Sequence, residues 1–173
     1  TLPVRTGTGL AAVAGFEYAG VEAGLKASGG RDVALVRNLG PEFTAAAVFT
    51  SNRFAAAPVE WSRQVVSEGR AEAVVLNSGG ANACTGPEGF QNAHRTAEEV
   101  GELLHAAAGD VLVCSTGLIG VQLPMDLLSA GVGRAASSQA DGAEADRAAA
   151  EAIMTTAPLP KRASGVRQTD DGP

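Results

Sequence analysis

The stretch DVLVCSTGLIGVQLPM, residues 110–125, decides the fold that we expect for this chain. Its apolar run Val111–Cys114 has the length and composition of a buried strand. Small hydroxyl residues then lead into Gly117, and Pro124 marks the start of a helix. A buried strand that passes into a helix through small residues is typical of an α/β fold.

The turn after this strand can also carry chemistry. Gly117 has no Cβ, so a ligand can approach its backbone closely. Exposed backbone N–H groups and the hydroxyl of Thr116 can hold an oxygen that becomes negative during acyl transfer. The alternative is a glycine-containing turn without a chemical role, and the residues of this turn taken alone favour that interpretation.

The segments on both sides of residues 110–125 alternate between strand and helix signals. Thr85 and Glu88 have the spacing of a capping box, as do Asp141 and Glu144, so each pair indicates a helix start. Strands are expected over residues 32–37, 44–50, 72–76 and 111–114, and helices over 58–67, 85–109, 124–136 and 141–156. This alternation predicts the α/β class.

An uncharged loop of ten small residues, NSGGANACTG at 77–86, follows the third of these strands. The amides of Asn77 and Asn82 can bond either the loop backbone or the polar atoms of a ligand. For each asparagine taken alone, a side chain that stabilises its own turn is the preferred interpretation.

Composition excludes several classes of protein. The chain has 173 residues, which suits one domain or a piece of one, and its net charge of −6 argues against a nucleic-acid surface. No apolar run approaches the length of about 20 residues that a membrane span needs, and the first residues do not resemble a signal peptide. We therefore expect a cytoplasmic protein.

The residue types that bind metals are sparse and widely spaced. His94 and His105 lie too far apart on their expected helix to share a metal ion, and Cys84 and Cys114 lack the spacing of a zinc site. We interpret both cysteines as small hydrophobic residues that stay reduced. No metal site and no cofactor is expected.

Three segments in a fixed order carry a resemblance to a known family. They are NSGGANACTG (77–86), CSTGLIG (114–120) followed by LPM (123–125), and AIMTT (152–156) followed by PK (160–161). Together they resemble the N-terminal (α) chain of the ornithine acetyltransferase (glutamate N-acetyltransferase) family of arginine biosynthesis. The similarity runs from about Gly15 to Lys161.

This resemblance implies a layered α/β fold that a separate β chain completes. It implies a precursor that cleaves itself, so that the new N-terminal Thr of the β chain becomes the nucleophile. That Thr takes an acetyl group from N-acetylornithine and passes it to glutamate by ping-pong transfer; acetyl-CoA is a further donor to consider. Residues 1–161 would form the α-chain half of the catalytic domain in an αβ hetero-oligomer, and 162–173 a loose polar tail.

The resemblance also assigns site residues. Thr116 and Gly117 correspond to the oxyanion-hole pair, and Thr155 to a substrate-binding residue. We expect Gly117 to tolerate no side chain, because a Cβ would intrude where the acyl oxygen sits.

Two departures from the family pattern accompany this assignment. Ala157 stands where the family has Asp. The family segment that ends at the scissile Ala–Thr bond is absent from the sequence, and the nucleophile with it. We therefore expect this polypeptide alone to be inactive.

Three other functions remain open from the sequence. One is a paralogous acetyltransferase of antibiotic pathways, although the loop 77–86 favours the biosynthetic branch. Another is a serine hydrolase that uses Ser115 with His94 and Asp110, although no G-x-S-x-G elbow surrounds Ser115. The third is a small-molecule binding module built on the glycine loops; no G-x-G-x-x-G motif follows a predicted strand, which argues against dinucleotides.

Overall fold

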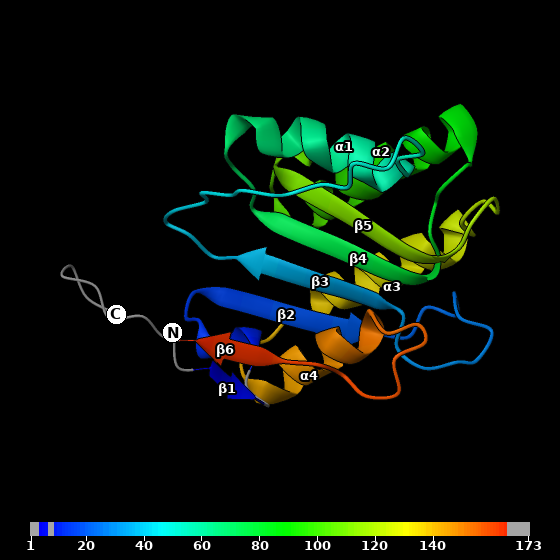
Figure 1. Cartoon of the computed structure of the whole chain (residues 1–173). Helices are drawn as coiled ribbons and strands as arrows, with labels where there is room; N and C mark the ends of the chain where they lie inside the picture. The colour runs from blue at the N-terminus through cyan, green and yellow to red at the C-terminus, as the bar shows by residue number, and fades with distance from the viewer. Residues whose placement is uncertain (1–3, 7–8, 166–173) are drawn as a thin grey trace.

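A four-stranded sheet forms the centre of the computed structural model, which describes residues 4–6 and 9–165 (Figure 1). In spatial order its strands are β2 (Phe16–Val21), β3 (Val33–Asn38), β4 (Ala73–Gly80) and β5 (Val111–Leu118). The pairs β2–β3 and β3–β4 are antiparallel, whereas β4 and β5 are parallel. A separate antiparallel pair joins β1 (Val4–Thr6) to β6 (Ala163–Gly165).

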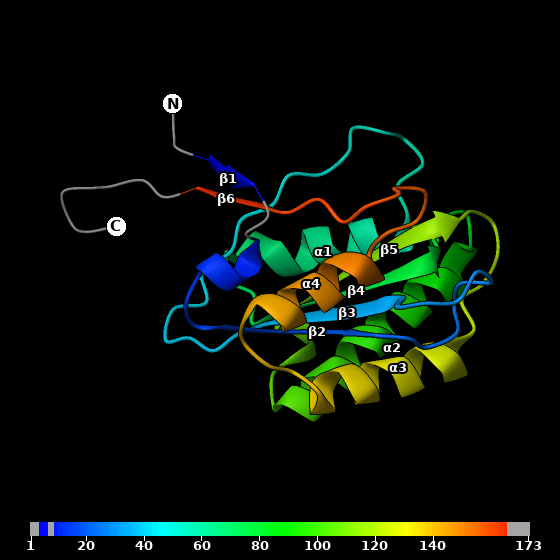
Figure 2. The ribbon, with the colours of Figure 1, turned by 90° about the horizontal axis from the view of Figure 1, so that it is seen from below.

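Helices cover both faces of the central sheet, as the turned view shows (Figure 2). They are α1 (Ala57–Val65), α2 (Gly86–Leu104), α3 (Met125–Ser137) and α4 (Ala143–Ala152), with short 3-10 turns η1 (Leu10–Ala12), η2 (Val66–Glu68) and η3 (Ala108–Asp110). α2 and α3 pack on one face, and α4 lies on the other face over β2 and β3. The predicted α/β class is confirmed.

The two faces of the sheet bury different clusters of side chains. Val33 and Leu35 point into the main core under α2 and α3, whereas Ala34 between them packs toward α4 in the same cluster as Tyr18. Successive strand residues face opposite sides of the sheet, so neighbouring residues enter different clusters. Gly20 lets α4 come closest, because a Cβ at this position would lie 2.0 Å from the carbonyl oxygen of Ala148.

Helix α1 covers the outer edge of β5. The Ser62 hydroxyl donates to the Val113 carbonyl oxygen at 2.8 Å and accepts from the Val113 N–H at 2.9 Å. The indole N–H of Trp61 donates to the Val111 carbonyl oxygen at 3.0 Å. These side chains satisfy backbone groups that an edge strand would otherwise leave unpaired.

The structure corrects the predicted strands in two places. Residues 44–50 do not form a strand; Thr44 makes only an isolated bridge to Arg70, and Val48 is fully exposed. Apolar composition suggested a strand there, but none of the strands in the described part of the chain pairs with it. Conversely, strand β2 was not predicted, because residues 15–30 are rich in glycine, which is uncommon in strands. Gly20 within β2 is instead needed where α4 packs against the strand.

The helix boundaries differ from the predicted ones at the caps. α2 ends at Leu104, where His105 adopts φ 58°, and does not continue to Gly109. The Thr85 hydroxyl donates to the Asn82 side-chain oxygen instead of capping α2. α4 begins after Gly142 without a side-chain cap, and it ends at Ala152, before residues 154–156. Neither capping-box pair therefore forms the side-chain cap that its spacing predicts.

The stretch expected to be a loose tail from residue 162 begins with ordered contacts. Arg162 pairs with the buried carboxylate of Asp146 at 3.1 Å, and the short strand β6 follows. Residues 166–173 lie outside the described residues. Across the described part of the chain, no helix is both long enough and apolar enough to span a membrane.

Candidate active site

One pocket brings together the three residues that the family resemblance singled out. Thr116 and Gly117 lie near the end of β5, and Thr155 lies just beyond α4, yet all three line a pocket of about 630 Å³. Its other lining residues are Leu25, Lys26, Ala27, Ser28, Gly79, Leu118 and Thr156. Residues that are distant in sequence thus share one cavity, and their roles in it stay predictions.

The pocket lies where the parallel strands β4 and β5 end. In α/β proteins, ligand sites gather at the carboxyl ends of parallel strands. The last turn of α4 reaches this edge because the buried Ser78 hydroxyl of β4 donates to the Ala152 carbonyl oxygen at 2.5 Å. This bond carries the residues that follow α4 to the open end of the strands.

The backbone of β4 gives a reason for glycine at position 117, in addition to the predicted space for an acyl oxygen, which stays a prediction. The φ of Gly117, +135°, is one that residues with side chains rarely adopt. A Cβ at Gly117 would lie 2.5 Å from the carbonyl carbon of Gly79 and 2.7 Å from the nitrogen of Gly80. A side chain there would therefore strike the backbone of β4.

The asparagine-containing loop before α2 is held by its own side chains. The buried Asn77 amide donates to the Gly80 carbonyl oxygen at 3.1 Å and accepts from the Ser115 hydroxyl at 2.5 Å. The Asn82 amide, also buried, donates to the Gly89 carbonyl oxygen at 2.8 Å. Both asparagines thus have the structural role that was preferred for each of them.

The pocket has one source of charge that sequence reasoning missed. Among the described residues that line it, only Lys26 has a charged side chain, and its ammonium donates to the Met154 carbonyl oxygen at 2.9 Å. The available signal was a single basic residue in an otherwise glycine- and alanine-rich stretch. Nothing local, however, indicates that this stretch lies beside Thr155.

The serine-hydrolase constellation is not assembled. Asp110 lies directly before β5 and pairs with Arg70 at 2.9 Å. Ser115 lies well inside the strand, and the rise per strand residue places it roughly 16 Å from Asp110. His94 stacks on Trp61 with ring centroids 4.7 Å apart. These residues have structural partners and do not form a nucleophile–base pair.

The cysteines are correctly predicted to be free thiols, but both are exposed instead of packed as small hydrophobic residues. Although the Cys114 residue is exposed, desolvation of its sulfur raises the thiol pKa above the ordinary value. The thiol is therefore protonated at neutral pH and is a poor nucleophile. Within the described residues, no group of three His, Cys, Asp or Glu side chains lies close enough to hold a metal ion.

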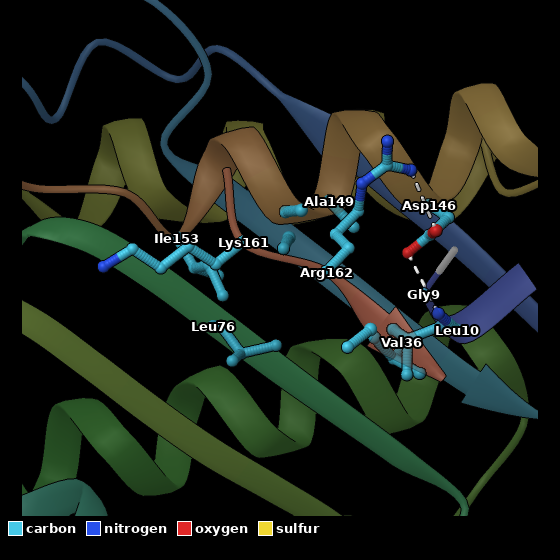
Figure 3. A pocket seen from close by; sticks show the side chains of 12 residues that line it. Gly9, Leu10, Val36, Leu76, Asp146, Ala149, Ile153, Lys161 and Arg162 are labelled. Atoms are coloured by element: carbon cyan, nitrogen blue, oxygen red, sulfur yellow. Dashed lines mark hydrogen bonds and ion pairs between the residues drawn. The ribbon is translucent and has the colours of Figure 1, made fainter. Parts of the chain in front are cut away.

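A second, smaller pocket of about 290 Å³ lies between α4 and the sheet (Figure 3). Apolar side chains form most of it, including Leu10, Val36, Leu76 and Ile153. Its buried carboxylate, Asp146, is engaged by Arg162 and by the backbone N–H of Leu10, as the dashed lines in Figure 3 show. This pocket offers no group placed for acyl transfer.

Comparisons with known proteins agree on one family. The sequence model of the ArgJ family matches residues 17–171. The arginine biosynthesis bifunctional protein ArgJ of Mycolicibacterium paratuberculosis is 56% identical over 159 residues, which are 89% of this chain and 39% of that protein. Its counterpart in Mycobacterium tuberculosis H37Rv is 54% identical over 159 residues, again 89% of this chain and 39% of that protein. The chain therefore spans about two fifths of the curated relatives that it matches.

A solved structure supports the same grouping. Ornithine acetyltransferase of Mycobacterium tuberculosis, in complex with ornithine, matches with a TM-score of 0.92 and 52% identity, covering 94% of this chain and 87% of that chain. The predicted fold type is thereby confirmed. The family model, the curated relatives and the solved structure together show that this chain belongs to the ArgJ family.

Proposed function

We propose that this chain is the α part of a cytoplasmic, self-cleaving N-acetyltransferase that moves an acetyl group from N-acetylornithine to glutamate. The observation that carries the proposal is the convergence of Thr116, Gly117 and Thr155 on one pocket. A relative of known structure is an ornithine acetyltransferase with bound ornithine. Acyl transfer through an enzyme hydroxyl needs no cofactor.

A second chain would complete the protein, and two observations support it. The match covers 87% of the solved Mycobacterium tuberculosis chain but only 39% of the curated protein from that organism, so the solved chain is much shorter than the curated sequence. The present chain also leaves apolar surface uncovered. Val48 and Phe54, between β3 and α1, are 99% and 81% exposed.

The central sheet also leaves apolar side chains uncovered. On the face that carries α4, that helix packs mainly on β2 and β3 and touches β4 through Leu76 and Ser78. Leu112 and Val74 beyond it stay half-buried, and Cys114 is exposed. Apolar surface of this kind is typical of an interaction site. We propose that the β chain covers it.

The chemistry proceeds in two balanced steps. The hydroxyl oxygen of the β-chain Thr attacks the acetyl carbon of N-acetylornithine. The α-amine of the same Thr takes the hydroxyl proton and passes it to the leaving amine, and ornithine departs. The amine of glutamate then attacks the acetyl ester and restores the hydroxyl. In both steps the acyl oxygen becomes negative, and the Thr116 hydroxyl with the Gly117 N–H would stabilise it.

Intact-mass spectrometry of the native protein, combined with an acetyl-transfer assay, tests this proposal. We expect two chains, the second beginning with Thr, and acetyl transfer from N-acetylornithine to glutamate. Parallel assays with acetyl-CoA and with other acyl donors would identify further donors. One uncleaved chain without transferase activity would refute the proposal, and a lone chain that acts on esters would favour a hydrolase.

The substrate-binding role of Thr155 gives a first mutational prediction. Thr155→Val keeps the shape of the side chain and removes its hydroxyl, so a hydrogen bond to substrate is lost. We expect KM for N-acetylornithine to rise by about tenfold, which corresponds to one hydrogen bond, while the precursor is still cleaved. Steady-state kinetics of the cleaved enzyme measure this. An unchanged KM would exclude the role.

A further inference from the structure

A buried carboxylate organises the loop that forms one wall of the candidate active site. Asp32, at the start of β3, has no exposed surface. Its carboxylate oxygens accept the backbone N–H groups of Ala23 at 2.5 Å, Gly24 at 3.0 Å, Leu25 at 2.6 Å and Lys26 at 3.2 Å. Four consecutive amides converge on one side chain, so this loop has a defined conformation instead of a mobile one.

The same loop is joined to β4. The Ser78 N–H donates to the Asp32 carbonyl oxygen at 2.8 Å. A Cβ on the adjacent Gly79 would lie 2.6 Å from the Leu25 carbonyl oxygen, so the two backbones are in direct contact there. Because Gly79 in turn touches Gly117, the loop backbone, β4 and β5 form one close-packed unit at the pocket.

Lys26 extends from this unit to the segment that carries Thr155. Its ammonium donates to the Met154 carbonyl oxygen at 2.9 Å, one peptide bond before Thr155. No ion pair involves Lys26 within the described residues. α4 has ended at Ala152, and the Met154 N–H still donates to the Glu151 carbonyl oxygen at 3.2 Å, so the Lys26 bond fixes the carbonyl side of Met154, which leads into Thr155.

We propose that Lys26, with its backbone held by Asp32, is a positioning residue that sets the distance between Thr155 and the Thr116–Gly117 pair. This inference rests on the proposed function, because it deepens the account of that same pocket. Without the ammonium, Met154 loses its donor and the Thr155 segment moves relative to β5. The expected defect lies in substrate binding through Thr155, whereas Thr116 and Gly117 keep their places in the strand.

A double-mutant cycle on the complete cleaved enzyme tests the proposal, with KM for N-acetylornithine as the readout. Lys26→Met is expected to raise KM by about tenfold with little change in kcat, and Lys26→Arg, which retains a cationic donor, to restore most of the loss. In a Thr155→Val background, Lys26→Met should raise KM by less than about twofold, because residues that act through one another are not additive.

Hydrogen exchange supplies a readout independent of activity. In Lys26→Met we expect faster exchange at the amides of residues 154–156 and unchanged exchange within α4. The matched control is Lys161→Met, which removes the exposed second lysine of the chain and should change neither KM nor exchange at 154–156. If Lys26→Met does not fold, Lys26→Ala, which also removes the donor to the Met154 carbonyl oxygen, takes its place.

Three results would overturn the inference. The first is an equal rise in KM in both backgrounds, which would mean that Lys26 acts independently of Thr155. The second is unaltered exchange at residues 154–156. The third is an unmutated enzyme that transfers no acetyl group from N-acetylornithine, and that result alone would refute the proposed function as well.

Discussion

Thr116→Ala is expected to lower kcat for acetyl transfer by about a hundredfold, or about 3 kcal/mol, while KM changes little. The reason is that an oxyanion donor acts mainly when charge develops on the acyl oxygen, and much less on the bound substrate. Thr116 is exposed in the pocket, where its hydroxyl is accessible. Self-cleavage also requires attack on a carbonyl group, so kinetics must be measured on the cleaved fraction alone.

Ser115→Ala is the matched control, because it removes a hydroxyl from the neighbouring residue. The Ser115 hydroxyl is engaged with the Asn77 amide of β4 and does not line the pocket. We expect Ser115→Ala to lower the melting temperature while kcat stays near that of the unmutated enzyme. A Thr116→Ala enzyme that behaves in the same way, melting lower but turning over normally, would show that Thr116 is a structural residue of β5 without a catalytic role.

Gly20→Ala is expected to have the largest effect on stability, lowering the free energy of unfolding by about 3 kcal/mol. The added Cβ would lie 2.0 Å from the Ala148 carbonyl oxygen and 2.6 Å from the Ala149 nitrogen, so two backbones collide and no side-chain rotation relieves the contact. α4 must move away from β2. Urea denaturation of the complete protein measures the loss as a lower midpoint.

Gly133→Ala provides the control for this substitution. Gly133 lies within α3, and a Cβ there would have no atom within 4 Å. Alanine favours a helix over glycine by up to about 1 kcal/mol, so the midpoint should stay the same or rise. Equal midpoints for the two variants would show that α4 adjusts to the larger residue without cost.

Displacement of α4 has a further consequence for the site. The Ser78 hydroxyl holds the Ala152 carbonyl oxygen, and Thr155 follows within three residues. We therefore expect Gly20→Ala to raise KM in addition to its effect on stability. Gly133→Ala should leave KM unchanged, because α3 lies on the opposite face of the sheet.

The α/β class and most helices were predictable because their signals are local. The strand that begins at residue 111 and the helices that begin near residues 57, 86, 125 and 143 all follow from hydrophobic period and from proline or glycine at the boundaries. The prediction ended this strand at residue 114, whereas β5 continues to Leu118 and includes the residues expected in a turn. The motif residues 116, 117 and 155 were predictable only from family resemblance. Their hydroxyl and glycine chemistry also fits ordinary turns.

Contacts between distant segments decided the rest. Glycines at 20, 79 and 117 look like loop residues in the sequence, but each stands where two backbones touch, which no local pattern reveals. Residues 44–50 had the composition of a strand, but none of the described strands pairs with them. A strand is stabilised by its neighbours, so composition alone cannot establish it.

The sequence by itself determined the fold class and the four main helices, because periodicity is a property of short segments. The oxyanion-hole role of Thr116 and Gly117 came from the family resemblance and stays a prediction. Only the tertiary structure decided that Lys26 and Thr155 line the same pocket as Thr116, and that Asp32 holds the loop that carries Lys26. Those relations depend on contacts between segments that are distant in the chain, such as the hydrogen bond from Lys26 to Met154, and these form only when the sheet and α4 assemble.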